Sequence, residues 1–463
     1  MTNVCIIVLD AVRAQNLSCY GHNRKTTPNI DKIAEESVVF KNAVSPAAVT
    51  LDSTASLFTG LYPGEHRTGQ NGEIITEVPQ LPEILRENGY ETGAVTTNPF
   101  ITPGFGFERG IDEFYSGEHR FESGMNIRKF FDRHKHRSAY QIYLRFLIDS
   151  IDRNFISHVG NALQFRFDIF NRNDNGAQEA TNSVLNFIDS KESPWFLYTH
   201  YSEAHMKNTD NLYKLPDKYK YKFVDEDTVE SVGVERDPDE EYSKASQDVH
   251  EKLYDGAIHY LDDKVKEIIN SIKSNNEWDD TLFIITSDHG ECLGDFGAMG
   301  HGHLHEPGIH VPLIVKLPSQ VKKSGDSFNR TNTLGIYKTI LEITNTGSDV
   351  THTQVPGIFE DQDYVLTQDY SGSWDWSSYS GDIKGQHALY SGDIKLIKQG
   401  NKNRLYKIYG RDNRKSLIDD PREEELEKLL NDYTSTFNES EKSVDDIGVD
   451  KKTSERLEDL GYL

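Results

Sequence analysis

The sequence predicts an α/β fold, a mostly parallel sheet with helices packed on its faces. Two apolar runs, VCIIVL at 4–9 and TLFIIT at 281–286, are typical of strands buried on both faces. The first ends at Asp10, and the second is followed by Asp288 and His289. Ligands of such sheets gather at the carboxyl ends of the strands. These three side chains should therefore converge on a divalent metal ion, although each segment alone also fits an ordinary strand-end turn or helix cap.

Residues 50–66 (TLDSTASLFTGLYPGEH) add a hydroxyl. The stretch from Ser53 predicts a helix that Gly60 and Pro63 terminate, with Thr50 beside its N-terminus. The free N–H groups and positive dipole end of such a helix favour an oxyanion such as phosphate or sulfate. A hydroxyl bound there to a metal ion can lose its proton and act as a nucleophile. Taken alone, a threonine at this position more often caps the helix or is simply buried.

Longer segments carry a resemblance to a known family. They are, in chain order, LDAVRAQNLSCYG (9–21), the stretch 26–66, FLYTHYSEAH (196–205), SDHGECLGDFG (287–297), GHGHLHEPGIHVPLIV (300–315) and ERLEDLGYL (455–463). In this order they resemble the sulfatase-like members of the alkaline phosphatase superfamily. The resemblance implies that superfamily's mostly parallel sheet between helices, with a smaller C-terminal α+β domain that carries an antiparallel sheet. It also implies metal-dependent hydrolysis of sulfate- or phosphate-type esters.

The chain departs from the sulfatase pattern at the nucleophile. True sulfatases have Cys or Ser there, with Pro two residues on and Arg four residues on, for conversion to formylglycine. The corresponding residues are Thr50, Asp52 and Thr54. Threonine cannot become the formylglycine aldehyde, and the cysteines of this chain lie elsewhere. We therefore expect Thr50 to act unmodified.

The predicted metal site is also smaller than that of many relatives. They show two adjacent aspartates after the first strand, whereas here Asp10 is followed by Ala11. This loss favours one divalent ion, held by Asp10, Thr50, Asp288 and His289. Oxygen ligands with one imidazole suit Mn²⁺, Mg²⁺, Ca²⁺ or Zn²⁺ without choosing among them.

Two further histidines are expected to complete the site. By resemblance, His205 matches a substrate-contacting histidine, and His301 matches a Lys or His near the leaving group, where an imidazolium could protonate the departing oxygen. His303 and His305 are weaker candidates that fit loop hydrogen bonds as well as a second metal site shared with His301. Arg13 is expected either to hold an anion or to play a structural role behind the ligands.

Composition limits the partners and the location. A formal net charge of −25 over 463 residues argues against nucleic acid as a partner. No stretch approaches the roughly 18 apolar residues of a membrane-spanning helix. The first strand begins at about residue 4, leaving no room for a signal peptide, and the three cysteines imply no disulfide framework. A cytoplasmic location is therefore expected, and the oligomeric state is left open.

The chain divides into two expected domains. A catalytic domain covers 1–345, with a helix-rich insertion at about 116–192 and an acidic loop at about 206–250. A small C-terminal domain covers 346–463. Further expected elements are strands at 195–199 and near 311–318, a helix at 252–273, antiparallel strands from about 360 and a helix at 421–437.

These features indicate a metal-dependent ester hydrolase that acts on a small-molecule or glycan-linked anionic ester. Phosphodiester or phosphonate monoester hydrolysis through Thr50 is the leading expectation. Sulfate ester hydrolysis by the unmodified Thr50 is the second, and transfer of a phosphoglycerol- or phosphoethanolamine-type group to a glycan is the third. A non-catalytic binding protein on the same fold is the alternative of a different class, since it would tolerate Ala11 and the lost Pro and Arg.

Overall fold

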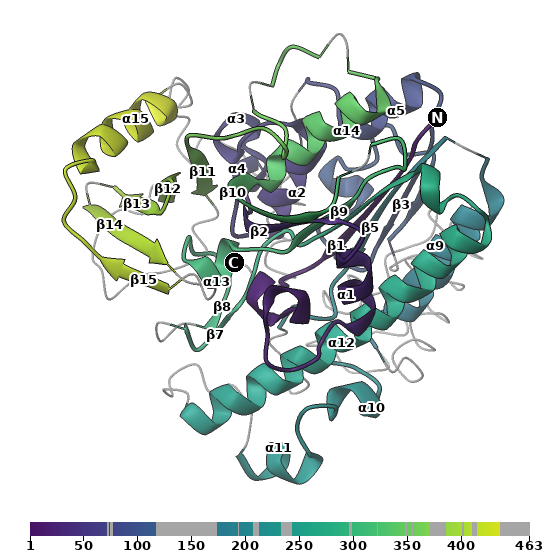
Figure 1. Cartoon of the computed structure of the whole chain (residues 1–463), viewed down its shortest axis with the longest axis horizontal. Helices are drawn as coiled ribbons and strands as arrows, with labels where there is room; N and C mark the ends of the chain where they lie inside the picture. Colours follow the sequence, from purple (N-terminus) through teal and green to yellow (C-terminus); the bar gives the residue numbers. More distant parts are fainter. Residues whose placement is uncertain are drawn as a thin grey trace, which may run out of the picture.

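A computed structural model of the chain has a central sheet between two layers of helices, with a second, smaller sheet to one side (Figure 1). The described residues are 1–71, 74, 77–116, 174–192, 194–206, 213–232, 243–295, 299–321, 323–347, 350–353, 355–370, 386–400, 402–409 and 414–435. The predicted α/β fold class is confirmed. Among the described residues, no helix is long and apolar enough to cross a membrane.

The central sheet has eight strands in the order β10-β2-β9-β6-β1-β5-β3-β4. Their bounds are β1 Asn3–Leu9, β2 Val38–Val44, β3 Glu91–Thr96, β4 Glu113–Tyr115, β5 Trp195–Tyr201, β6 Thr281–Thr286, β9 Leu313–Lys316 and β10 Gly325–Asn332. The strands β6, β1, β5, β3 and β4 are parallel, and β9 runs antiparallel between β6 and β2. The β1 strand therefore lies in the middle, with the carboxyl ends of β6 and β5 on either side of its own.

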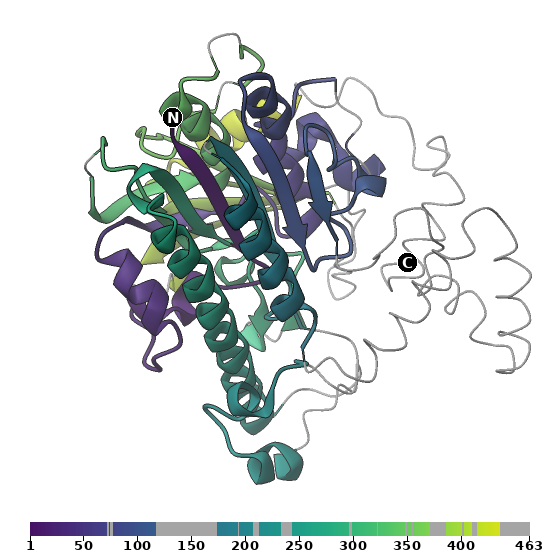
Figure 2. The ribbon, with the colours of Figure 1, turned by 90° about the vertical axis from the view of Figure 1, so that its right-hand side faces the viewer.

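Alternate residues of β1 belong to two different hydrophobic cores, because successive side chains of a strand point to opposite faces. Cys5, Ile7 and Leu9 pack with helices α1 Pro28–Ala34, α9 Ala177–Ser190 and α12 Lys244–Ser274. Val4, Ile6 and Val8 pack with helices α2 Thr50–Thr59, α5 Leu81–Glu87 and α14 Ile336–Thr344. Figure 2 shows the long α12 and α9 side by side across one face of the sheet. Burial on both faces explains why the strands read as continuous apolar runs.

The second sheet is antiparallel and contains five strands in the order β11-β12-β13-β14-β15. Its elements are β11 Val365–Asp369, β12 Gln386–Ser391, β13 Ile394–Gln399, β14 Lys402–Tyr409, β15 Arg414–Leu417 and the helix α15 Glu423–Ser435. The antiparallel strands and the following helix expected from about residue 360 are present. The division at residues 345 and 346 into two domains stays a prediction.

Short elements connect the two sheets and their helices. They are η1 Ala14–Asn16, η2 Ser18–Tyr20, α3 Pro63–His66, α4 Thr68–Asn71, η3 Pro103–Phe105, α10 Asp217–Lys220, α11 Glu226–Val232, η4 Trp278–Asp280, β7 Cys292–Leu293, β8 Met299–Gly300, α13 Glu306–Ile309 and η6 Thr333–Gly335. The acidic loop expected at about 206–250 is wrong where that segment is described, because α10, α11 and the start of α12 lie in it. Most of the expected insertion at 116–192 lies outside the described residues.

Candidate metal and ester-binding site

The two strand-end carboxylates lie side by side, as predicted. Asp10 directly follows β1, and Asp288 lies two residues after β6. These strands are parallel neighbours in which Val8 pairs with Thr286, so their carboxyl ends reach the same edge of the sheet. Both side chains are buried, and both carboxylates face His289. Asp10, Asp288 and His289 therefore form a group whose donor atoms lie within 4.8 Å of one another.

The His289 ring is oriented as a metal ligand would be. Its Nδ1 lies 2.8 Å from the carbonyl oxygen of Gly290, which can only accept, so Nδ1 donates. The lone pair of the neutral ring is then on Nε2. This atom lies 3.6 Å from Asp10 Oδ1 and 3.6 Å from Asp288 Oδ2. A backbone carbonyl commonly fixes a ligating histidine in this way.

Thr50 is the first residue of α2, a little earlier than the helix start expected near Ser53. Its Oγ1 lies 3.2 Å from His289 Nε2 and 3.5 Å from Asn98 Nδ2. No side chain among the described residues caps the first turn of α2. The helix is fixed against the metal-site turn by Ser53 Oγ, which donates to the carbonyl oxygen of Asp288 at 2.6 Å. The Thr50 hydroxyl thus lies at a helix N-terminus, beside the metal-site group.

Two side chains at this site were not among the predicted site residues. Asn98 follows β3 and donates through Nδ2 to Asp10 Oδ2 at 2.6 Å. His200, the next-to-last residue of β5, has its Nε2 3.5 Å from Asp10 Oδ2 and 3.6 Å from Asp288 Oδ2. The sequence signal for His200 was its place at the end of an apolar strand, the same signal that identified Asp10.

Several buried polar atoms of this site have no hydrogen-bond partner among the residues that the structure describes, as expected if they bind a divalent cation. Asp10 Oδ1, Asp288 Oδ2 and His200 Nε2 are buried and form no hydrogen bond within the described part of the chain. Native proteins rarely leave several such atoms together without a reason. Two buried carboxylates at one point also repel each other unless a cation lies between them. Their oxygens and the His289 nitrogen are donors that divalent ions accept in proteins.

Ala11 offers no side-chain ligand to the site, but its backbone N–H and carbonyl groups form contacts there. Its φ is 61°, in the left-handed region that residues other than glycine seldom adopt. Two contacts fix this turn, because its N–H donates to Asp288 Oδ1 at 3.2 Å and its carbonyl accepts from Tyr254 Oη at 2.7 Å. The strained turn therefore helps to hold the Asp288 carboxylate.

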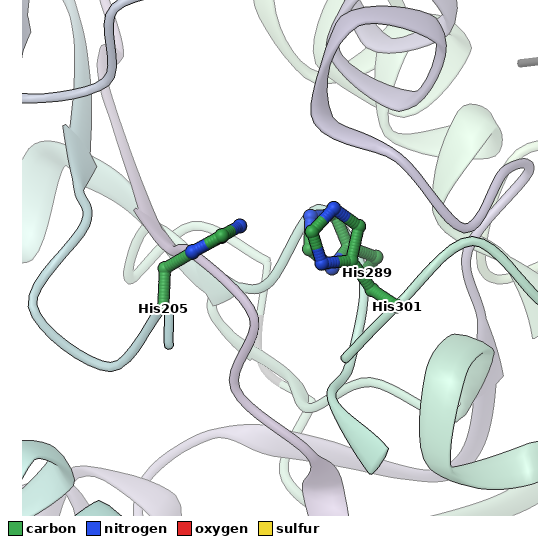
Figure 3. A group of neighbouring side chains, drawn as sticks. All are labelled: His205, His289 and His301. Atoms are coloured by element: carbon green, nitrogen blue, oxygen red, sulfur yellow. The ribbon is translucent and has the colours of Figure 1, made fainter. Parts of the chain in front are cut away.

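His205 and His301 lie beside His289, as Figure 3 shows. The rings of His289 and His301 stack with centroids 4.4 Å apart, and the His205 ring lies edge-on to His301 at 4.7 Å. The three rings have donor atoms within 4.8 Å of one another, but the lone pairs of His289 and His301 lie in nearly parallel planes, so these two rings cannot both point at one ion as they stand. The three rings form an imidazole wall beside the metal-site group.

The pKa of His205 and the pKa of His301 shift in opposite directions. Burial lowers the pKa of His205, and the nearby Asp10 only partly offsets this. Burial also disfavours the charged form of His301, but the carboxylate of Glu291, 3.5 Å from His301 Nδ1, raises the pKa of His301 above its ordinary value. Burial opposes ionisation of Glu291, yet His301 and its neighbours lower the pKa of Glu291 to about 2. Of the two histidines, His301 is the one whose environment favours the protonated form.

Three other candidates lie away from the metal-site group. His303 Nε2 lies 2.7 Å from the sulfur of Cys292, and the His305 ring lies near Tyr406. The second metal site considered for His301, His303 and His305 is therefore not formed. Arg13 donates through Nη1 to Asp295 at 2.8 Å and through Nε to Asn16 at 2.8 Å. Its carboxylate partner is not one of the two at the metal site.

The family model for sulfatases matches residues 2–346. The chain belongs to the sulfatase family. It is 22% identical over 510 residues to an N-acetylglucosamine-6-O-sulfatase of Bacteroides thetaiotaomicron, covering 97% of this chain and 88% of that protein. It is 25% identical over 388 residues to the multifunctional alkaline phosphatase superfamily protein PehA of Trinickia caryophylli, covering 73% of each.

Solved structures agree on the fold. A phosphonate monoester hydrolase from Silicibacter pomeroyi superposes with a TM-score of 0.66 at 19% identity, covering 94% of this chain and 95% of that one. The hydrolase from Agrobacterium radiobacter gives 0.63 at 17% identity, covering 99% and 96%. The predicted superfamily is confirmed, and the chain is an ester hydrolase of the alkaline phosphatase superfamily.

Proposed function

We propose that this sulfatase-family protein hydrolyses phosphodiesters or phosphonate monoesters, with Thr50 as an unmodified nucleophile and one divalent metal ion. The observation that carries the proposal is the place of Thr50. Its Oγ1 is 3.2 Å from His289 Nε2, at the start of α2 and beside two buried carboxylates, and the nucleophile position itself holds neither the cysteine nor the serine that formylglycine requires. A small or glycan-linked anionic ester is the proposed substrate, and a cytoplasmic location remains part of the proposal.

The metal ion would be held by Asp10, Asp288, His289 and Thr50. When bound, it would supply positive charge that lowers the pKa of the Thr50 hydroxyl and neutralises the transferred group. The first turn of α2 supplies N–H groups and the positive end of the helix dipole for the anionic oxygens of the ester. Asn98, through its Nδ2 near both Asp10 and Thr50, orients the two groups relative to each other.

The reaction proceeds in two displacements at the central atom of the ester. In the first, Thr50 attacks as the alkoxide, its proton having passed to solvent, and the bond between Thr50 Oγ1 and phosphorus forms as the bond to the leaving oxygen breaks. In the second, the oxygen of water forms a new bond to phosphorus as the bond to Thr50 breaks; His301, left neutral by the first displacement, takes one proton of that water, and Thr50 leaves as the alkoxide. His301 Nε2 or Nδ1 gives its proton to the leaving oxygen, which is consistent with the carboxylate of Glu291 raising the pKa of His301.

Sulfate ester hydrolysis is the second candidate, because the N-acetylglucosamine-6-O-sulfatase above aligns over nearly the whole chain. A solved structure at 15% identity and a TM-score of 0.64 is described as a complex with its substrate, D-glucosamine-2-N,6-O-disulfate. Sulfate and phosphate-type esters share a tetrahedral anionic centre, so the same nucleophile and cation would serve either. Transfer to a glycan alcohol in place of water is the third candidate.

The test compares matched aryl esters of phosphodiester, phosphonate monoester and sulfate type. Protein freed of metal by a chelator is assayed with Mn²⁺, Mg²⁺, Ca²⁺ or Zn²⁺ restored in turn. The proposal predicts metal-dependent turnover that is fastest on a phosphorus ester. Turnover of the sulfate alone would favour the second candidate, and no turnover with no bound metal would favour the non-catalytic binding protein.

A further inference from the structure

His200 is a buried imidazole that the mechanism above does not use. It lies on β5, the neighbour of β1 on the side away from β6, so it approaches the two carboxylates from a different strand than His289. We propose that His200 is a metal ligand that takes the place of the carboxylate lost at Ala11, and that it shifts the site toward Zn²⁺. This inference rests on the metal site of the proposed function, but not on which ester is hydrolysed.

His200 lies within ion-pair range of both carboxylates, but its distances to them are longer than a hydrogen bond and match the spacing of ligands around one ion. An N–H···O hydrogen bond places its two heavy atoms about 2.7–3.2 Å apart. His200 Nε2 instead lies 3.5 Å from Asp10 Oδ2 and 3.6 Å from Asp288 Oδ2, and forms no hydrogen bond within the described residues. A tetrahedral ion with ligands at about 2.1 Å holds its donors roughly 3.4 Å apart. His289 has the same spacing of 3.6 Å to both aspartates.

The other side of the ring is arranged to support ligation. His200 Nδ1 lies 2.8 Å from Tyr198 Oη, and both residues are fully buried. In the tautomer with its proton on Nδ1, the ring donates to Tyr198 and presents the Nε2 lone pair to the carboxylates. The Tyr198 ring is itself held edge-on by Phe58 of α2 at 5.0 Å. Ligating histidines commonly have such an outer partner for the second nitrogen.

The exchange of one ligand for another explains the metal preference. A carboxylate at residue 11 would add a hard oxygen donor, whereas His200 adds an imidazole from the neighbouring strand. Two imidazoles and two carboxylates, together with the Thr50 hydroxyl, form a donor set that suits Zn²⁺, while Mg²⁺ and Ca²⁺ prefer oxygen ligands alone. The substitution of Ala11 is therefore compensated within the fold.

The experiment counts the imidazole nitrogens that bind the metal ion, using Mn²⁺ as the probe. Full-length protein is stripped with a chelator and loaded with Mn²⁺, and pulsed electron paramagnetic resonance records the couplings to ¹⁴N. The proposal predicts two directly bound imidazole nitrogens in the wild type and one in His200→Gln. The His205→Gln variant, which removes a nearby imidazole outside the ligand set, should retain both.

Zn²⁺ affinity provides a second readout that does not depend on catalysis. His200→Gln should lower it by more than the roughly 10- to 100-fold that removing an outer partner of a ligand costs, and adding Ala11→Asp should restore binding while moving the preference toward Mg²⁺ and Ca²⁺. Aspartate tolerates a positive φ better than most residues, so this rescue respects the backbone of residue 11. One bound nitrogen in the wild type, or unchanged Zn²⁺ affinity in folded His200→Gln, would overturn the proposal while leaving the metal site intact. No Mn²⁺ or Zn²⁺ binding by the wild type would overturn both.

Discussion

At the scale of single residues, the strongest assignments come from charges at the ends of buried strands. Asp10 and Asp288 could be predicted because an apolar run that stops at a carboxylate is visible in the sequence. Asn98 and His200 were not predicted as site residues. Asn98 lies in a loop that carries no motif, and His200 reaches the carboxylates only because β5 pairs with β1. That pairing joins residues from distant parts of the chain, so no local sequence pattern predicts it.

The Glu291–His301 pair makes a prediction about pH. Glu291 stays ionised because its pKa is about 2, and its charge raises the pKa of His301. If protonated His301 is the general acid, kcat falls as the pH rises through that raised pKa. Glu291→Gln removes the charge, so the alkaline limb of the kcat profile should move to lower pH by about one unit.

The matched control is Asp295→Asn, which removes a carboxylate that contacts Arg13 and not His301. The alkaline limb of its kcat profile should lie at the same pH as that of the wild type. Steady-state rates measured across pH on one substrate are sufficient for all three proteins. An alkaline limb that is unmoved or moved upward in Glu291→Gln would contradict the role assigned to His301.

At the scale of elements, α2 is notable because all of its residues are buried. A helix ending at Gly60 could be predicted, and Gly60 does end it with a positive φ of 70°. The start of α2 at Thr50 could not be predicted, because no side chain among the described residues caps it and Val49, the residue before it, is not a typical helix-capping residue. The elements inside the predicted acidic loop were missed for a related reason: short polar helices such as α11 lack the apolar periodicity that identifies buried ones.

Asp52 in the first turn of α2 makes a prediction about stability. Burial, with a smaller contribution from Asp369, raises its pKa to about 7, although the N–H of Gly69 donates to Oδ1 at 2.6 Å. A carboxyl with a raised folded pKa stabilises the fold below its unfolded pKa, and this contribution is lost as the pH rises through about 7. Asp52→Asn should therefore raise the free energy of unfolding at pH 8, on the order of 2 kcal/mol, and change it little at pH 4.

Urea denaturation at the two pH values checks this difference. Asparagine keeps the oxygen that accepts from Gly69 and replaces Oδ2 by an NH2 group of similar size, so the charge is removed with little change of shape. Asp227→Asn is the control, because Asp227 is an exposed first-turn acid of α11 and should show no gain at pH 8. Equal or lower stability of Asp52→Asn at pH 8 would contradict a destabilising buried charge at Asp52.

At the scale of the whole molecule, a buried ion pair connects the five-stranded sheet to the segment that carries His301. Lys395 of β13 donates to Glu306 Oε1 at 2.9 Å and to the carbonyl of Leu304 at 2.5 Å. Tyr390 of β12 donates to the same Glu306 oxygen at 3.0 Å. Glu306 begins α13, shortly after His301, so the smaller sheet is positioned to hold one wall of the site.

Removing one partner of this pair should cost more than removing both. Lys395→Met leaves the buried Glu306 carboxylate without its cationic partner. We expect this to lower the free energy of unfolding by about 3 kcal/mol. Lys395→Met combined with Glu306→Gln should recover part of that loss. A double-mutant cycle by urea denaturation measures the difference. Strictly additive effects of the two substitutions would contradict a coupled pair.

The role of Thr50 as the nucleophile is tested by Thr50→Val, which removes the hydroxyl while keeping the shape of the side chain. Turnover of an aryl phosphonate monoester is measured for metal-loaded wild type, Thr50→Val and the control Thr54→Val, one turn further along α2. We expect kcat to fall by at least about 10³-fold for Thr50→Val, and by less than about 10-fold for Thr54→Val. Acid-quenched wild type should carry the phosphonyl group on Thr50. A Thr50→Val rate within about 10-fold of wild type would show that Thr50 is not the nucleophile.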